Sequence, residues 1–239
     1  MPELIYQTDS YTKEFDAMVT SVLPEERAVV LDRTAFYPGG GGQPCDFGTL
    51  TIHNVTYPVN KVKKQGDDVL HFLGGEEALQ DVGSTAHGAL DWARRYKLMR
   101  THTALHILCG TVFRDYGALV TGGEMEPGKG RLDFEFETMR GELVREIEAA
   151  INKEAAQGYE IQVQILPREE AFQIPDLIRT KINLLPVGIT HVRTVEIVGL
   201  DLQADGGTHV HNTSEVGKIR IADYKSKGAI NKRIYIEIE

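Results

Sequence analysis

Two pairs of closely spaced histidines are the residues of this 239-residue chain best suited to binding a metal ion. His102 and His106 lie four residues apart, and His209 and His211 lie two apart. Residues i and i+4 of a helix are neighbours on one face, so the first pair can present two imidazole nitrogens to one ion. Such a pair alone is weak evidence, because it is more often a packing residue beside a surface imidazole. The metalloprotease motif needs a Glu after the first histidine, and that position is Thr103 here.

The segment DLQADGGTHVHNTSEVG (201–217) contains candidates for the remaining ligands. Its glycine pair allows a tight turn, which lets Asp205 and His209 both point toward a metal held by the helix. If the segment is a strand, His211 lies on the same side as His209 and is a reserve ligand or contacts a ligand. The alternative is a Gly-Gly turn followed by a strand histidine without a chemical role.

The segment TAFYPGGGGQPCDFG (34–48) is a glycine-rich loop with an aromatic pair, Phe36 and Tyr37. No Gly-Lys-Ser/Thr follows the glycines, so the loop is not a phosphate-binding P-loop. The glycines mark either a crossing of two backbones or a lining for the path of a substrate.

Hydrophobic patterning predicts two kinds of structure along the chain. The first ninety residues contain short β-forming runs separated by glycine-rich turns, which predicts a small all-β, barrel-like domain over residues 1–90. Three of the expected strands are AVVLD (28–32), TLTI (49–52) and VLHFL (69–73).

Two helices are predicted after this domain. The first runs from Trp92 to near Gly117, because a 4-3-4-3 spacing places five residues on one stripe. The stripe consists of Leu98, His102, Leu105, Cys109 and Val112. The second helix has Thr138 as its expected N-cap and Gly158 as its stop. Its inward residues are Val144, Ile147 and Ile151.

Strands dominate again after the second helix. They are predicted at IQVQI (161–165), THVRTVEIV (190–198), GKIRIADY (217–224) and RIYIEI (233–238), the last two as a closing pair. The predicted class is therefore α+β. The β-rich domain of residues 1–90 precedes an α+β domain of residues 91–239 with an antiparallel sheet and two main helices.

Composition restricts the class of protein. A hydrophobic content of 41% is sufficient for a core, and no run approaches the roughly 20 apolar residues of a membrane helix, so we expect a soluble cytoplasmic protein. Cys45 and Cys109 are expected to be free thiols. The net charge of −9 argues against broad adhesion to nucleic acid, so any RNA contact must be local. The basic stretches are Lys61, Lys63 and Lys64, then Arg94, Arg95, Lys97 and Arg100, then Lys218, Arg220, Lys225, Lys227, Lys232 and Arg233.

Taken together, three segments resemble the freestanding alanyl-tRNA editing proteins (AlaX, medium length) and the matching editing domain of alanyl-tRNA synthetase. These segments are FYPGGGGQPCDFG (36–48), DWARRYKLMRTHTALHIL (91–108) and DLQADGGTHVHNTSEVGKIRI (201–221), in the order of the family. The resemblance covers nearly the whole chain. Three independent motifs in one order are a specific signal, unlike the histidine pair alone.

The resemblance implies hydrolysis of Ser-tRNA(Ala), sometimes also of Gly-tRNA(Ala), at a zinc site near the acylated 3′ end. The two helix ligands of the family fall on His102 and His106, and its later histidine ligand falls on His209. The commoner family pattern has Cys where this sequence has Asp205. Asp205 either completes a site of three histidines and one carboxylate, leaves an open position for water, or acts as a base or orienter without binding the metal.

In the expected mechanism, the metal binds or positions a water, lowers its pKa toward about 7, and directs it to the ester carbonyl that joins serine to the terminal adenosine. Anchoring of the substrate's amino group is an alternative role for the metal. Serine differs from alanine by one hydroxyl, and a site that hydrogen-bonds this hydroxyl can reject its absence. Thr121, in GALVTGG (117–123), is the candidate partner of the hydroxyl, and a turn threonine after a helix is the competing interpretation.

Other functions stay open at this point. They are editing of a different mischarged tRNA, hydrolysis of small esters, and RNA binding without catalysis. The presence of all three histidines argues against an inactive module, because a site without a function does not require three metal ligands. The expected partner is the acceptor end of mischarged tRNA(Ala), with no membrane and no stable protein partner, and the sequence does not indicate an oligomeric state.

Overall fold

The computed structural model describes residues 2–79, 81–180, 185 and 188–239. The chain divides into two compact units, Met1–Lys97 and Leu98–Glu239, and helix α1 (Trp92–Tyr116) begins in the first and continues into the second. Strands and helices are both abundant, so the predicted α+β class is confirmed. The domain boundary near residue 90 stays a prediction. Within the described residues, no helix combines the length and apolar character needed to cross a membrane.

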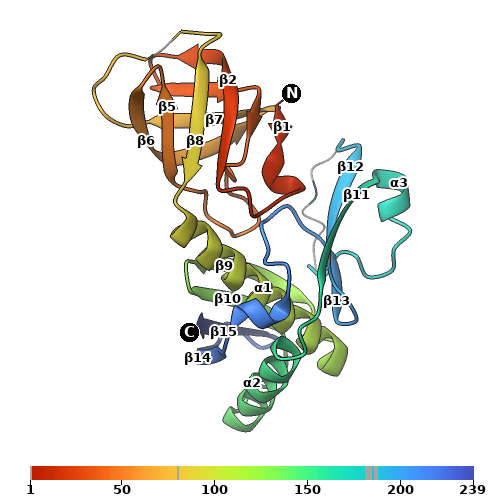
Figure 1. Cartoon of the computed structure of the whole chain (residues 1–239). Helices are drawn as coiled ribbons and strands as arrows, with labels where there is room; N and C mark the ends of the chain where they lie inside the picture. Colours follow the sequence, from red (N-terminus) through yellow and green to blue (C-terminus); the bar gives the residue numbers. More distant parts are fainter. Residues whose placement is uncertain (1, 80, 181–184, 186–187) are drawn as a thin grey trace. The chain divides into compact units, whose positions relative to one another are not determined.

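The first unit is built around a closed six-stranded barrel with the strand order β2-β3-β7-β6-β5-β8 (Figure 1). Neighbouring barrel strands pair antiparallel. Closure removes the free sheet edges that would otherwise present unpaired backbone groups. The elements of this unit are β1 (Glu3–Leu4), η1 (Ile5–Gln7), β2 (Glu14–Leu23), β3 (Ala28–Leu31), β4 (Arg33–Thr34), β5 (Gly48–Ile52), β6 (Val55–Gln65), β7 (Asp68–Leu73) and β8 (Thr85–Leu90).

Alternation of apolar and polar residues directs one side of each barrel strand inward. In β2, Phe15, Ala17 and Val19 are buried, and the residues between them are exposed. Three strands predicted from the sequence correspond to β3, β5 and β7, and are confirmed. Strands β2, β6 and β8 were not predicted from the sequence. Their apolar residues alternate with polar ones, so they lack the short runs rich in β-forming residues that mark β3, β5 and β7.

The glycines of the glycine-rich loop are required by the backbone. Residues 39–42 have φ angles of +84°, +141°, +57° and +90°, a region in which a side chain is strained. Gly48 meets a different constraint, because a Cβ there would lie 2.1 Å from the carbonyl oxygen of Ala89 in the paired strand β8. Glycine therefore permits both the turn of the loop and the close approach of two backbones.

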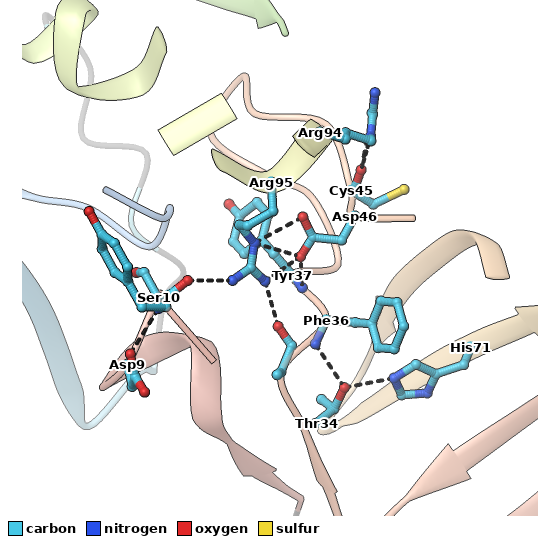
Figure 2. Close-up of polar contacts among 12 residues, drawn as sticks. Asp9, Ser10, Thr34, Phe36, Tyr37, Cys45, Asp46, His71, Arg94 and Arg95 are labelled. Atoms are coloured by element: carbon cyan, nitrogen blue, oxygen red, sulfur yellow. Dashed lines mark hydrogen bonds and ion pairs between the residues drawn. The ribbon is translucent and has the colours of Figure 1, made fainter. Parts of the chain in front are cut away.

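A buried ion pair connects this loop to the first turn of α1 (Figure 2). The Asp46 carboxylate accepts hydrogen bonds from Nε of Arg95 at 3.0 Å and from the backbone N–H of Tyr37 at 2.6 Å. The other guanidinium N–H groups donate to the carbonyls of Ser10, at 2.9 Å, and Ala35, at 2.5 Å. The side chains of the pair are 0% and 1% exposed, so the loop is held by a charge pair that is fully removed from water.

A second buried contact fixes the start of the same loop (Figure 2). Burial lowers the pKa of His71 to about 4, so its ring is neutral near neutral pH. The Thr34 hydroxyl lies 2.8 Å from Nε2 of His71 and accepts a hydrogen bond from the backbone N–H of Phe36 at 3.1 Å. Nδ1 of His71 faces the carbonyl oxygen of Val29 at 3.3 Å, so Nδ1 carries the single ring proton. The Thr34 hydroxyl therefore donates to Nε2 of His71.

The second unit combines α1 with two antiparallel sheets and helix α2 (Figure 1). One sheet has the order β14-β15-β10-β9 and the other the order β11-β12-β13. A Cβ on Gly130 of β10 would lie 3.0 Å from the Leu105 side chain, so α1 approaches this strand closely. The further elements are β9 (Val120–Glu126), β10 (Lys129–Glu135), α2 (Gly141–Ala155), β11 (Ile161–Pro167), α3 (Arg168–Ala171), β12 (His191–Ile197), β13 (Asp201–Ala204), η2 (Thr213–Val216), β14 (Ile219–Ser226) and β15 (Asn231–Ile238).

Most elements predicted in this unit are confirmed. The first predicted helix matches α1, the four later strands match β11, β12, β14 and β15, and the last two strands pair as expected. The predicted inward residues of α2 are buried. The predicted N-cap at Thr138 is wrong. The backbone stays extended through Arg140, the actual N-cap residue, which places Thr138 too far from the first free N–H groups of α2 to cap them.

Arg95→Met is expected to lower the free energy of unfolding by about 3–5 kcal/mol, because it leaves the Asp46 carboxylate buried and unpaired. Denaturant unfolding measures this loss. Arg33→Met is the matched control, because Arg33 pairs with Glu3 at 3.2 Å where the side chains are 45% and 63% exposed. Such exposed pairs contribute at most about 1 kcal/mol. Equal losses in the two variants would contradict the role of burial.

Candidate metal centre

Two segments far apart in the sequence bring four ligand-type side chains together in the second unit. Helix α1 contributes His102 and His106, and the turn after β13 contributes Asp205 and His209. One ligand atom of each residue lies within 4.8 Å of those of the other three. We refer to these four residues as the His3Asp site. The i, i+4 spacing on α1 and the tight turn before His209 place them as the sequence suggested.

The three imidazole rings pack against one another around the carboxylate. The ring of His102 stacks on that of His209 with centroids 4.2 Å apart, and His106 meets both rings edge-on at 4.9 and 4.6 Å. Asp205 Oδ2 lies 3.1 Å from Nε2 of His209, and Oδ1 lies 3.6 Å from Nε2 of His102. The Nε2 atoms of these two histidines therefore face the carboxylate.

Burial sets the protonation states within the His3Asp site. It lowers the pKa of His102 and of His106, and it lowers the pKa of His209 well below its usual range. Burial alone would raise the pKa of Asp205, but the interaction with His102 and the hydrogen bond from His209 outweigh it, and this pKa is well below the usual range. Neutral imidazoles and an ionised carboxylate are the forms that bind metal ions.

The turn and β12 hold Asp205 in place. Its Oδ2 accepts a hydrogen bond from the backbone N–H of Gly207 at 2.8 Å, which closes an Asx turn. Nη1 of Arg193 donates to the carbonyl oxygen of Asp205 at 2.9 Å and lies 3.7 Å from Oδ2. Asp205 is therefore positioned through both its backbone and its carboxylate.

Thr103 supports His209 from the side facing α1. Its Oγ1 lies 3.1 Å from Nδ1 of His209 and accepts a hydrogen bond from the backbone N–H of Val210 at 3.4 Å. While Nε2 of His209 donates to Asp205, Nδ1 is the acceptor and the Thr103 hydroxyl donates to it. In the other tautomer Nδ1 donates to Thr103, which leaves the lone pair on Nε2 for a metal. The hydroxyl at this position thus serves the later histidine, where the metalloprotease motif would have a glutamate base.

The other two rings also lie beside polar groups other than Asp205. His102 makes a hydrogen bond to the backbone of Thr208. Nδ1 of His106 lies 3.7 Å from Oδ2 of Asp201 and has no hydrogen-bond partner among the described residues. Metal-binding histidines usually have such groups behind the ring, because these groups orient the ring and select its tautomer.

Sequence reasoning missed the supporting residues of the site. Thr103 was considered only as the position where a metalloprotease would have glutamate. Asp201 lies in the segment 201–217, but its spacing suggested no role. Arg193 is one of several cations on strands, and nothing in its spacing singles it out. Their contribution depends on which elements pack together, so it becomes visible only in three dimensions.

Two further residues named from the sequence lie elsewhere. Thr121 is an exposed residue of β9, and its hydroxyl donates to Oδ1 of Asn231 at 3.0 Å. Its role in recognising serine stays a prediction. His211 is exposed, lies outside the named strands and is not part of the His3Asp site, so the strand-based argument for it as a reserve ligand does not apply.

Many cations of the predicted basic stretches are engaged within the protein. Arg95 pairs with Asp46, and Arg233 donates to Asp133 at 2.6 and 2.8 Å. The ammonium group of Lys232 donates to two backbone carbonyls of its own hairpin at 2.8 Å. These three cations therefore stabilise the fold through contacts within the protein. The thiols of Cys45 and Cys109 are free, as predicted.

Comparisons with known proteins match both halves of the chain. A family described as "tRNA synthetases class II (A)" matches residues 7–94, and one described as "Threonyl and Alanyl tRNA synthetase second additional domain" matches residues 192–235. The chain is 40% identical to a Saccharolobus solfataricus protein named "Alanyl-tRNA editing protein AlaX-M", covering 100% of both chains. It is 36% identical to a Methanosarcina acetivorans protein of the same name, covering 100% of this chain and 99% of the other. An alanine–tRNA ligase of Ignicoccus hospitalis is 38% identical over 91% of this chain, which corresponds to 24% of the ligase.

Thr103→Val is expected to lower the free energy of unfolding by about 1–3 kcal/mol, because the buried N–H of Val210 and the ring nitrogen of His209 lose their partner. Denaturant unfolding of the metal-free protein measures the effect. Thr111→Val is the matched control on the same helix, because the buried Thr111 hydroxyl has no hydrogen-bond partner among the described residues. A Thr103→Val protein as stable as Thr111→Val would show that the contact with His209 does not form.

Proposed function

The chain belongs to the family of AlaX-M alanyl-tRNA editing proteins, and from this premise we propose that it hydrolyses the ester bond of tRNA(Ala) wrongly charged with serine, in solution in the cytoplasm. The observation that carries the proposal is the convergence of three buried imidazoles and one carboxylate in the His3Asp site. The acceptor end of the mischarged tRNA is the proposed partner, and Gly-tRNA(Ala) is a second substrate of the same chemistry.

A zinc ion fits the donors of the His3Asp site. Three neutral imidazoles and one carboxylate form a set of nitrogen and oxygen ligands that zinc accepts. The carboxylate of Asp201, 3.7 Å from Nδ1 of His106, also supports the fit, because metal-binding histidines usually have such a group behind the ring. We propose His102, His106, His209 and Asp205 as the ligands. When bound, zinc supplies Lewis-acid chemistry for ester hydrolysis.

Asp205 is the residue at which this chain departs from the commoner cysteine of its family. Its Oδ2 is engaged by Gly207 and His209, whereas Oδ1 faces His102. A carboxylate held on both sides is suited to act as a fixed ligand, because the rigid turn opposes the swinging motion that makes carboxylates weak ligands. We therefore favour Asp205 as the fourth ligand over Asp205 as a mobile general base.

Discrimination between serine and alanine requires a polar group that meets the serine hydroxyl. A buried polar group left unpaired by alanine would disfavour the correctly charged tRNA by more than the loss of one contact. Thr121 stays our proposed partner for this hydroxyl, and because it is exposed, the penalty arises only where the bound substrate covers it. Its oxygen can still accept a hydrogen bond while it donates to Asn231.

The purified protein is expected to deacylate Ser-tRNA(Ala) much faster than Ala-tRNA(Ala), with activity lost on chelation and restored by zinc. Release of labelled amino acid from the two tRNAs, together with the zinc content of the protein, measures this. Equal hydrolysis of both substrates would contradict editing. Hydrolysis of a small activated ester without any effect on the tRNAs would favour the small-ester alternative, and no hydrolysis by zinc-loaded protein would favour a silent RNA-binding module.

The matched variant for this assay is His102→Ala. It removes one proposed ligand, so deacylation should be abolished while the far-ultraviolet circular dichroism spectrum stays that of the fold. Unchanged activity would exclude the metal mechanism.

Substitution of Asp205 distinguishes a ligand from a base. Asp205→Asn keeps the shape of the side chain but replaces the carboxylate by a weaker neutral donor, so zinc affinity should fall by about tenfold or more. Asp205→Cys introduces the commoner family residue and should retain zinc and deacylation. Competition with a chromophoric chelator measures the affinity. If Asp205→Asn binds zinc as tightly as the original protein but loses activity, Asp205 is a base or orienter.

A further inference from the structure

The buried ring of His106 faces a carboxylate that does not belong to the His3Asp site. Its Nδ1 has no hydrogen-bond partner among the described residues, and Oδ2 of Asp201 lies 3.7 Å away. The Asp201 side chain is itself 0% exposed. A buried polar atom without a partner is destabilising, so a small side-chain shift that closes this gap to a hydrogen bond is favourable.

Two donors hold the Asp201 carboxylate in position. Nε of Arg179 donates to Oδ1 at 3.2 Å, and the side-chain amide of Gln203 donates to Oδ2. The guanidinium of Arg179 lies 4.0 Å from the centre of the Phe113 ring on α1, which fixes its own orientation. Asp201 is therefore directed toward the helix that carries His106.

Gly110 allows this approach. It lies one helical turn after His106, and a Cβ there would be 2.7 Å from the Cβ of Asp201. Glycine within a helix is destabilising relative to alanine. At this position it leaves the space that the carboxylate needs to reach the imidazole.

We propose that Asp201 is a positioning residue that places the proton of His106 on Nδ1. An ionised carboxylate only accepts hydrogen bonds, so the ring nitrogen that it faces must be the one that carries hydrogen. The lone pair is then on Nε2, on the side of the ring away from Asp201, and available to a metal. This inference rests on the proposed metal-dependent function, although the tautomer itself exists without a metal.

Asp201→Asn tests this role because it changes the chemistry with little change in shape. Arg179 has no acceptor atom, so the new side chain must direct its oxygen to Arg179 and its NH2 group to His106 and Gln203. The Gln203 amide can flip to present its oxygen to this NH2 group, which leaves the second N–H for His106. That NH2 group donates to Nδ1, which moves the ring proton to Nε2 and removes the metal-binding lone pair. A merely structural role predicts that Asp201→Asn is milder than Asp201→Ala, whereas the proposal predicts that it is at least as damaging to metal binding.

The first measurement is the His106 tautomer in the metal-free protein, from long-range ¹H–¹⁵N spectra at about pH 8, above the usual histidine pKa of about 6.5. The original protein should show the Nδ1–H form, and Asp201→Asn should show the Nε2–H form. An Nε2–H form in the original protein, or an Nδ1–H form in the variant, would overturn the proposal. Because no metal is needed, this result is independent of the proposed function.

The second measurement is zinc affinity by competition with a chromophoric chelator. Asp201→Asn and Asp201→Ala should each weaken binding by about 10–100-fold, the range for groups behind metal-binding histidines. Asp133→Asn is the matched control, because Asp133 is a buried carboxylate paired with Arg233 and is not among the grouped ligands. It should leave zinc affinity unchanged. Zinc affinity of Asp201→Asn equal to that of the original protein would overturn the proposal, whereas absence of zinc binding by the original protein would refute the metal-dependent function alone.

Discussion

Three neutral imidazoles around a buried carboxylate impose a constraint that extends through the second unit. Polar groups removed from water must find partners, because each unpaired one costs several times the net free energy of an ordinary hydrogen bond. Within the site, Asp205 meets this requirement through Gly207, Arg193 and His209. The imidazole rings have the same requirement, since the second nitrogen of each ring also needs a hydrogen-bond partner. Polar residues of β12, β13 and α1 therefore occupy buried positions near the site that apolar residues could otherwise fill.

The need to pair buried polar groups also shapes the first unit, where the buried ion pair of Arg95 and Asp46 lies. Arg95 occupies a place in the core that an apolar residue could fill, and all of its donors reach Asp46 or backbone carbonyls. Asp46 and the carbonyl of Ala35 belong to a loop whose four glycines with positive φ prevent it from forming regular structure, and the carbonyl of Ser10 belongs to the segment before β2. A loop without strand or helix hydrogen bonds must satisfy its backbone groups elsewhere. The buried guanidinium supplies donors for this purpose, which explains a charged residue in so dry a position.

Periodicity along the sequence predicted the helices and strands better than it predicted helix boundaries or the residues that support the His3Asp site. The 4-3-4-3 stripe was sufficient to locate α1, because long helices carry many repeats of their pattern. The cap of α2 was misplaced because the actual N-cap residue, Arg140, makes no side-chain capping bond, so no favoured capping residue marks the start of the helix. His102, His106, Asp205 and His209 could be named because they lie in short local motifs. Asp201, Arg193 and Thr103 gain their contacts from strand pairing and helix packing, which spacing along the chain does not encode.

In the proposed zinc site, a carboxylate at the position where the resemblance implies a cysteine changes what the rest of the site must provide. Thiolate binds zinc strongly through its own softness, whereas a carboxylate is harder, forms a less covalent bond and rotates more easily. The turn N–H and Arg193 restrict that rotation, yet both also draw on the negative charge of Asp205 and so weaken it as a donor. The three imidazoles must then supply a larger part of the binding free energy. Because the basicity and tautomer of each imidazole depend on the group behind its ring, our proposal gives Thr103 and Asp201 more weight in this chain than they would have beside a thiolate.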